Sequence, residues 1–192
     1  MNRICVGLFC ALVAAGASAR DGFDPYGSGG GPYGSGYGYY SNAYVGLSFG
    51  QLRYSEQGLN VITPGTASVF VGARLSPFVS VEGRLGGGLG WADTNGYGLE
   101  VRSVFAGYLK GSIPLAPGVS IYGLGGIANV DLQRDFGIGY TNDTGFSYGL
   151  GMNFDLGSNA QLGVEWTHLV NAYNLGYPYD VNQASIAVGW RF

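Results

Sequence analysis

Apolar residues recur at every second position along eight segments between residue 43 and the C-terminus. A period of two is typical of β-strands, because successive side chains point to opposite faces of a sheet. The glycines of the fifth segment leave its register open. The sequence therefore predicts an all-β chain with strands at about residues 43–52, 66–75, 79–91, 99–110, 119–129, 145–155, 160–168 and 183–192.

Charged residues avoid the apolar face of every expected strand. Those that fall on the opposite face are Arg74, Glu82, Arg84, Glu100, Arg102, Lys110, Asp155, Glu165 and Arg191. A cation that faces lipid at the bilayer midplane costs roughly 2–4 kcal/mol. Several such placements would exceed the roughly 5–15 kcal/mol that keeps a domain folded. The separation therefore favours lipid outside the sheet and a polar, charged interior.

The composition distinguishes a membrane barrel from a soluble sandwich. Charged residues make up 11% of the 192 residues, against about 25% in an ordinary soluble domain. Aromatic residues reach 15%, and there are 37 glycines. A secreted β-sandwich is the alternative, but its wet surface would normally carry many more charges. We therefore expect an eight-stranded antiparallel up-and-down transmembrane β-barrel over residues 43–192.

The N-terminal 42 residues divide into two expected segments. Residues 1–19 are typical of a secretory signal peptide, with Arg3 before an apolar run and Ala17-Ser18-Ala19 at the cleavage site. The apolar run is too short to be a membrane-spanning helix. Residues 20–42 are rich in Gly, Tyr and Ser, which predicts a flexible periplasmic leader.

Several partners and cofactors are disfavoured by the same sequence. Cys5 and Cys10 both lie in the signal segment, so the mature chain has no thiol for a disulfide or a metal. Without Arg3, eight Lys and Arg residues face twelve Asp and Glu residues, an anionic balance that argues against nucleic acid. Acids such as Asp93 and Asp135 lack the spacing of a calcium loop. No cofactor is expected.

The connections predict how the barrel is oriented. Links after the second, fourth and sixth strands are short, whereas residues 53–65, 92–98, 130–144 and 169–182 form longer links. Outer-membrane barrels have short periplasmic turns and long extracellular loops. Both termini are therefore expected in the periplasm. An aromatic girdle is expected at the two membrane interfaces, formed by Trp91, Trp166, Trp190 and Phe192.

The last strand carries a family resemblance. Residues 184–192 alternate apolar residues and end in Phe192, and residues 122–126 form a Gly-rich segment after a Pro-Gly turn. Both resemble the small eight-stranded outer-membrane barrels, the superfamily of opacity-type surface proteins and OmpA-like barrel domains. The terminal Phe192 is similar to the family's signal for the barrel-assembly machinery. The resemblance implies contact with outer-membrane lipid and lipopolysaccharide, and it covers residues 43–192.

The interior charges suggest how the barrel is closed. An eight-stranded barrel is just wide enough for side chains to fill, so charges of both signs predict a plug of salt bridges. By depth, we expect Arg74, Glu82, Lys110, Asp155 and Arg191 near the periplasmic end, Arg84 above them, and Glu100, Arg102 and Glu165 higher. The alternative is a narrow hydrated path, because many inward glycines would leave room for water.

The sequence contains only weak matches to the motifs of known enzymes. Residues 46–50 and 145–149 match Gly-x-Ser-x-Gly, but no helix follows either match, as that motif requires. Outer-membrane lipid A deacylases are small barrels with a His-x-Ser pair, and the matching stretch here is His168-Leu169-Val170. Val170 supplies no nucleophile. We expect no enzyme activity.

The leading hypothesis is a non-enzymatic surface barrel that supports the envelope or presents outer loops to a host or surface ligand. The Tyr-rich segment 171–180 is the candidate contact. A passive channel for small solutes is the second hypothesis, and an outer-membrane lipid-modifying enzyme is a distant third.

Overall fold

The computed structural model describes residues 43–192, except 58–59, 95, 136–138, 158 and 175–176. The expected signal peptide and leader, residues 1–42, lie outside this part of the chain. Within it, no helix is long and apolar enough to cross a membrane. The described strands are β1 (Ala43–Glu56), β2 (Gly65–Arg74), β3 (Val79–Gly88), β4 (Ala92–Thr94), β5 (Tyr97–Ala116), β6 (Val119–Arg134), β7 (Tyr140–Asp155), β8 (Ala160–Asn174) and β9 (Tyr177–Arg191).

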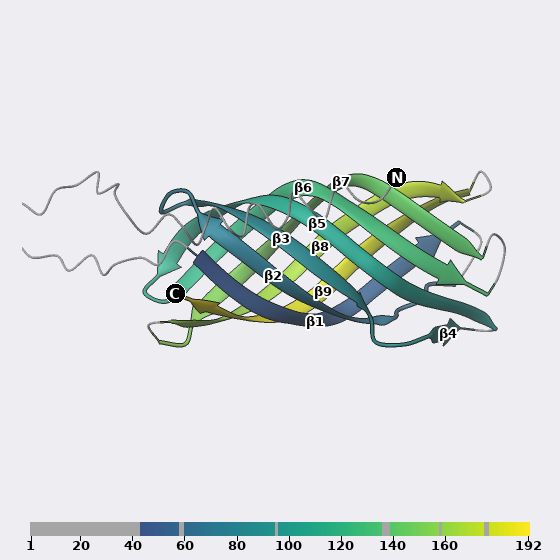
Figure 1. The fold of residues 1–192 in the computed structure, drawn as a ribbon, viewed down its shortest axis with the longest axis horizontal. Coiled ribbons are helices and arrows are strands. Elements are labelled where there is room, and N and C mark those ends of the chain that lie inside the picture. Colours follow the sequence, from purple (N-terminus) through teal and green to yellow (C-terminus); the bar gives the residue numbers. More distant parts are fainter. Residues whose placement is uncertain (1–42, 58–59, 95, 136–138, 158, 175–176) are drawn as a thin grey trace, which may run out of the picture.

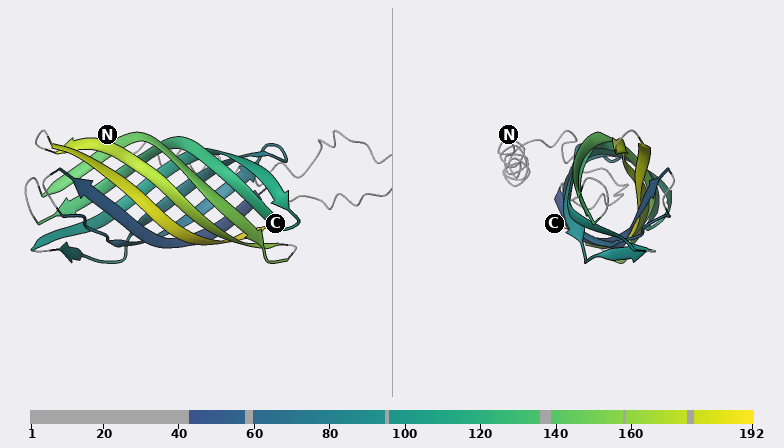
Figure 2. Two further views of the ribbon diagram at one scale, coloured as in Figure 1. Left: turned by 180° about the vertical axis from the view of Figure 1, so that it is seen from behind. Right: turned by 90° about the vertical axis from the view of Figure 1, so that its right-hand side faces the viewer.

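Eight of these strands close into a ring. Every long strand pairs antiparallel with its neighbours in sequence, β1 also pairs with β9, and β3 pairs with β5. The end-on view in Figure 2 shows the closed ring. The short β4 lies outside the ring and pairs only with the start of β5. The predicted eight-stranded antiparallel up-and-down barrel is confirmed, and closure leaves no long unpaired strand edge.

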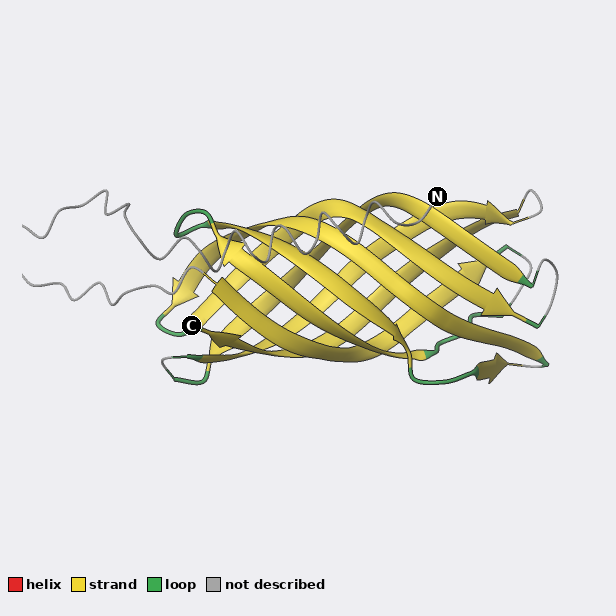
Figure 3. Ribbon diagram, viewed as in Figure 1, coloured by secondary structure: helices red, strands yellow, loops and turns green. Residues whose placement is uncertain are grey.

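The two ends of the barrel differ (Figures 1 and 3). The connections around Pro77 and Gly118 are short, and they lie at the same end as Ala43 and Phe192. We call this the turn end and the opposite end the loop end. At the loop end the predicted long loops were wrong in extent, because much of residues 53–65, 130–144 and 169–182 continues as strand.

Strand length exceeds one membrane crossing in six of the eight ring strands. β1 has 14 residues, β5 has 20, β6 and β7 have 16 each, and β8 and β9 have 15 each. A tilted strand crosses a bilayer with about 9–11 residues. The ring therefore has an extension of several residues per strand, which lies at the loop end.

The apolar side of the sheet changes along single strands. On β1, Leu47 and Phe49 are exposed on the outer surface, whereas Leu52 and Tyr54 are 0% exposed and face inward. On β9, Ile186 is exposed outward, whereas Val181 is buried. The β1–β9 pairing has no bulge between these positions, and the register shift in the β8–β9 pairing lies on β8. The apolar residues therefore move from odd to even positions on β1 and from even to odd positions on β9. We call the outward apolar residues, such as Leu47, Phe49 and Ile186, the outer apolar band, and the change of side at its end the switch.

Beyond the switch, the barrel is apolar inside and polar outside. We call this loop-end extension the rim. Its inward side chains belong to one buried cluster, which continues down the lumen to Tyr122. We call the part of this cluster in the rim the rim core, which comprises Leu52, Tyr54, Ile62, Leu99, Val101, Val130, Leu132, Leu169, Val170, Tyr179 and Val181. The hydrophobic effect explains the arrangement, because apolar side chains that leave lipid for water must be buried among themselves.

A bulge in β5 overturns the prediction for Glu100 and Arg102. The pairing with β6 shifts between Val101 and Ser103, and both Leu99 and Val101 turn inward. Glu100 and Arg102 therefore lie on the outer face of the rim, where the Arg102 guanidinium is 5.6 Å from the centroid of the exposed Tyr140 ring. Strict alternation predicts both side chains in the lumen, and the bulge breaks that alternation.

Inward glycines accommodate aromatic rings. A Cβ on Gly72 would lie 2.2 Å from Cζ of Tyr44, and one on Gly151 would lie 2.3 Å from Cζ of Tyr122. Phe70 lies against Gly46 in the same way. The expectation that such glycines leave room for water is wrong at these positions, because side chains from neighbouring strands fill the space.

Candidate functional site in the barrel lumen

Arg84 is the centre of a buried ion-pair network. Its Nε donates to Oε1 of Glu82 at 2.7 Å, and its Nη2 donates to Oε2 of Glu165 at 2.7 Å. A second bond joins Nη1 to Oε1 of Glu165, which makes that contact bidentate. β3 and β8 lie on opposite sides of the ring, so the Arg84–Glu165 pair spans the lumen. Bidentate charged pairs of this kind are the strongest hydrogen-bonded contacts in proteins.

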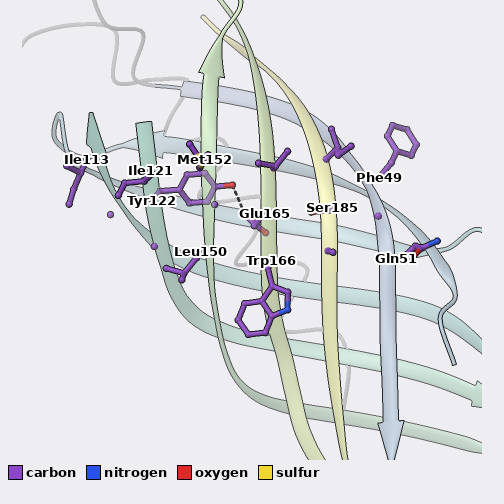
Figure 4. A pocket seen from close by; sticks show the side chains of 17 residues that line it. Phe49, Gln51, Ile113, Ile121, Tyr122, Leu150, Met152, Glu165, Trp166 and Ser185 are labelled. Carbon is purple, nitrogen blue, oxygen red and sulfur yellow. Dashed lines mark hydrogen bonds between the residues drawn. The ribbon is translucent and has the colours of Figure 1, made fainter. Parts of the chain in front are cut away.

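Other polar groups complete the network. The Nζ of Lys110 lies 3.4 Å from Oε2 of Glu82 and 3.8 Å from the centroid of the Tyr122 ring. The Tyr44 hydroxyl donates to Glu82 Oε2 at 2.8 Å, and the Tyr122 hydroxyl donates to Glu165 Oε2 at 2.9 Å (Figure 4). Two cations balance two carboxylates, so the layer is electrically neutral. We call Glu82, Arg84, Lys110 and Glu165 with these tyrosines the ion-pair network.

The other sequence-predicted lumen charges lie elsewhere. Arg191 forms an ion pair with Asp155 at the turn end. Arg74 is opposite Ser80 in the β2–β3 ladder and shares its inward face. The expected depth order was therefore only partly right, because Glu82 and Lys110 join Glu165 in the ion-pair network instead of the charges at the turn end.

A second polar group at the mouth was missed by the sequence reasoning. The Arg134 side chain is 3% exposed, and its guanidinium lies 4.9 Å from the Tyr54 ring centroid and 5.1 Å from that of Tyr179. Tyr54 donates a hydrogen bond to Glu56, and Tyr179 donates one to Asp143. Burial raises the pKa of both Tyr54 and Tyr179 above the ordinary value. The signal available was the continued alternation of Tyr54 and Glu56 beyond the predicted end of the strand.

Two cavities border the network. A cavity of about 20 Å³ lies between Glu82, Lys110 and Glu165, which is room for about one water. A larger depression of about 950 Å³ lies on the outer wall, where Figure 4 shows Phe49, Leu150 and Trp166 among its lining. Most of its side chains belong to the outward apolar band and offer a surface for acyl chains, but Tyr122 and Glu165 of the ion-pair network also line it.

The serine motifs have no catalytic partner among the described residues. Ser48 forms a hydrogen bond with Ser68 at 2.6 Å, and the Ser147 hydroxyl donates to the backbone carbonyl of His168 at 2.6 Å. Both contacts are of the kind that joins neighbouring strands in a sheet. No described group of His, Cys, Asp and Glu side chains has the geometry to hold a metal ion.

His168 packs in an aromatic cluster on the outer face. Its ring centroid is 5.0 Å from that of Tyr148, and its Nδ1 is 3.0 Å from Oδ1 of Asn182. A bulge between His168 and Val170 turns Val170 into the rim core. The two side chains therefore lie on opposite faces of β8, and a serine at position 170 would still lie on the face opposite the imidazole.

The predicted girdle residues are all exposed outward. Trp190 and Phe192 lie at the turn end. Trp166 lies near the switch, and its ring contacts Tyr148 edge-on with centroids 6.2 Å apart. Trp91 follows the end of β3 at the loop end. Two levels of aromatic residues therefore border the outer apolar band.

Comparisons with known proteins agree with this architecture. A family model for the outer membrane protein beta-barrel domain matches residues 6–192. No curated protein matches the chain by sequence. The chain is similar in structure to Ail, the attachment invasion locus protein of Yersinia pestis, with 16% identity, a TM-score of 0.59, and coverage of 80% of this chain and 99% of that one.

Two further solved structures share the fold. Neisserial surface protein A has 14% identity and a TM-score of 0.60, with 79% of this chain and 98% of that chain covered. The N-terminal β-barrel domain of Pseudomonas aeruginosa OprF has 13% identity and a TM-score of 0.53, with 80% and 99% covered. At these identities the likeness extends to the fold alone.

Proposed function

This chain belongs to the outer membrane protein beta-barrel domain family, and we propose that it acts as a non-enzymatic surface barrel with a closed lumen. The observation that carries the proposal is the filling of the interior. The ion-pair network crosses the ring at one level, and the rim core crosses it at another. A static cavity of about 20 Å³ near the network is too small to hold a hydrated solute.

The rim supports an outward orientation for the loop end. Its outer wall carries polar residues such as Arg53, Arg102 and Asp131, which belong in water. In this orientation the rim extends beyond the outer leaflet, where the apolar band and its aromatic borders contact lipid and lipopolysaccharide. The turn end, with both Ala43 and Phe192, faces the periplasm. The exposed Phe192 is then available to the barrel-assembly machinery.

The charge of the rim bears on which ligands it would bind. The solved structures include Ail in complex with the heparin analogue sucrose octasulfate, again with 16% identity to this chain and a TM-score of 0.53. On the outer face and described loops of the rim, the acids Asp93, Glu100, Asp131, Asp135 and Asp180 outnumber Arg53 and Arg102. A polyanion would be repelled. A host or surface ligand of this rim is therefore expected to be neutral or basic.

Electrical recording tests the closed lumen. Purified barrel refolded into planar lipid bilayers is expected to give no steady conductance, whereas a porin in the same bilayers serves as the positive control. Steady, discrete current steps from the wild-type protein would reject the closed barrel in favour of the small-solute channel. Lipid hydrolysis measured by mass spectrometry tests the enzyme alternative, and no deacylated product is expected.

A further inference from the structure

We infer that the rim core is the barrier that stops ions, and that the ion-pair network below it contributes structure but is not required for the seal. This inference rests on the closed lumen proposed above and assigns the closure to one layer. The two layers lie in series along the lumen, so they can be separated by substitution.

The rim core spans the full width of the lumen. Its members come from β1 and β9 on one side and from β5 and β6 on the other. In the eight-stranded ring, β1 is opposite β6 and β9 is opposite β5. Arg134 of β6 contacts the rings of Tyr54 on β1 and Tyr179 on β9, which are side chains from across the ring. Side chains from opposite walls of the ring therefore meet at this level.

One level of the rim core is purely aliphatic. Leu52, Leu132 and Val181 are each at most 1% exposed, and their side chains offer no hydrogen-bonding group to a water or an ion. An ion that entered between these three side chains would lose its hydration shell and gain no partner. The polar groups of Tyr54, Tyr179 and Arg134 lie nearer the mouth. Apolar constrictions close channels by this exclusion of water.

The ion-pair network presents a weaker barrier to ions. It holds the lumen's small cavity between Glu82, Lys110 and Glu165. Its carboxylates and cations can each exchange a protein partner for a water or a small ion. Since both signs of charge are present, neither cations nor anions meet a uniform repulsion. Charge removal in this layer would therefore add water while the rim core above it stayed closed.

The experiment compares conductance in three proteins. The first is the wild type, and the second is a network variant with Arg84→Gln and Glu165→Gln, in which amides replace the charges at similar size. The third adds Leu52→Ser and Leu132→Ser to the network variant, which shortens two rim-core side chains and makes them polar. A matched control adds Arg53→Ser and Gln133→Ser instead, at the adjacent outward positions of the same strands.

We expect no conductance from the wild type, the network variant or the matched control. We expect discrete conductance steps from the third protein. Conductance from the network variant alone would overturn this inference and assign the seal to the ion pairs. Conductance from the wild type would instead overturn the closed lumen itself, so the two failures are distinguishable.

A second, milder rim-core variant covers the case in which the serine variant does not fold. Val101, Val130, Val170 and Val181 are all buried in the rim core, and Val→Thr at these four positions keeps their shape while adding hydroxyls. Folding of each variant is checked by its shift between heated and unheated gel lanes. Both sets of rim-core substitutions are combined with the network substitutions. If both combined proteins fold and neither conducts ions, the rim core is not the barrier.

Discussion

Arg84 and Glu165 form a bidentate ion pair across the barrel, with the Nη2–Oε2 bond at 2.7 Å. Their strands are on opposite sides of the ring, so this one contact links two walls that share no backbone hydrogen bonds. Arg84 also pairs with Glu82 on its own strand. The guanidinium therefore holds two buried carboxylates, and its loss would leave Lys110, beside Glu82, as the remaining cation of the network.

Arg84→Met is expected to lower the free energy of unfolding by about 3–5 kcal/mol, the usual cost of removing one partner of a buried ion pair. Arg53→Met provides the control, because Arg53 is exposed on the outer wall of the rim and surface changes usually stay within about 0.5 kcal/mol. Urea unfolding in lipid vesicles, followed by tryptophan fluorescence, gives both values. Equal effects of the two substitutions would contradict the buried network.

Gly72→Ala is expected to destabilise the barrel by about 1–3 kcal/mol, the range for an overpacked core. The new Cβ would lie 2.2 Å from the Tyr44 ring, which donates to Glu82. Gly107→Ala is the matched control, since its Cβ would meet nothing within 4 Å. That change is expected to be neutral, or stabilising by up to about 1 kcal/mol because alanine restricts the unfolded chain. The same unfolding assay measures both. No loss of stability in Gly72→Ala would show that the Tyr44 side chain does not require a glycine at this position.

Two arginine substitutions on β6 test where the lipid ends. Ile127 and Gln133 both point outward, but Ile127 lies in the apolar band and Gln133 in the rim. Ile127→Arg is expected to cost about 1–2 kcal/mol, because Ile127 is the last outward position of the band and the cost of a cation falls from about 2–4 kcal/mol at the midplane to about 0–1 kcal/mol at the interface. Gln133→Arg is expected to change stability by about 0.5 kcal/mol or less. A similar cost at both positions would mean that the rim is embedded in lipid.

Alkaline pH is expected to weaken the mouth of the barrel. Burial raises the pKa of Tyr54 and Tyr179 in the folded state, so the fold favours the neutral phenols. Their contribution is complete below the unfolded tyrosine pKa of about 10, and it declines as pH rises above that value. The double variant Tyr54→Phe/Tyr179→Phe should show a shallower fall of unfolding free energy above about pH 10.

Tyrosinate absorbance supplies the independent check on the same two residues. In the folded wild type, part of the tyrosine signal should appear only at higher pH. The double Phe variant should show a smaller late component, because the buried Tyr44, Tyr108 and Tyr122 remain. Identical pH dependence of stability in the two proteins would contradict the burial of these phenols.

The sequence predicted the barrel because its strands carry a physical requirement at membrane depth. Residues such as Leu47, Phe49 and Ile186 must face lipid, and Glu82 and Arg84 must not, so alternation alone sets the faces. The same rule failed at Arg102, where a bulge breaks strict alternation. Bulges leave no clear mark in a single sequence, and the glycines of the fifth segment left its register equally open.

The rim was missed for a different reason. Residues 52–54 and 179–181 continue the alternation, but their apolar members fall on the inner side. The predicted first strand ends at about residue 52 and the predicted last strand begins at about residue 183, so both stop at this change of side. A change of side within one unbroken period of two is instead what a strand leaving the membrane should show. The contacts of Arg134 with Tyr54 and Tyr179 depend on which strands lie opposite in the ring, and the sequence alone could not place them.

Lipid contact measured along β6 tests the central claim most directly. The claim is that the outward positions face hydrocarbon in the band and water in the rim, while the inward positions face neither. Single cysteines at residues 121–133, placed in a barrel without Cys5 and Cys10 and labelled with a fluorophore, would be quenched by brominated lipid. The account predicts quenching at 121, 123, 125 and 127, reaction with a water-soluble thiol reagent at 129, 131 and 133, and neither at the even positions. Lipid quenching at 122 and 124, or at 131 and 133, would contradict it.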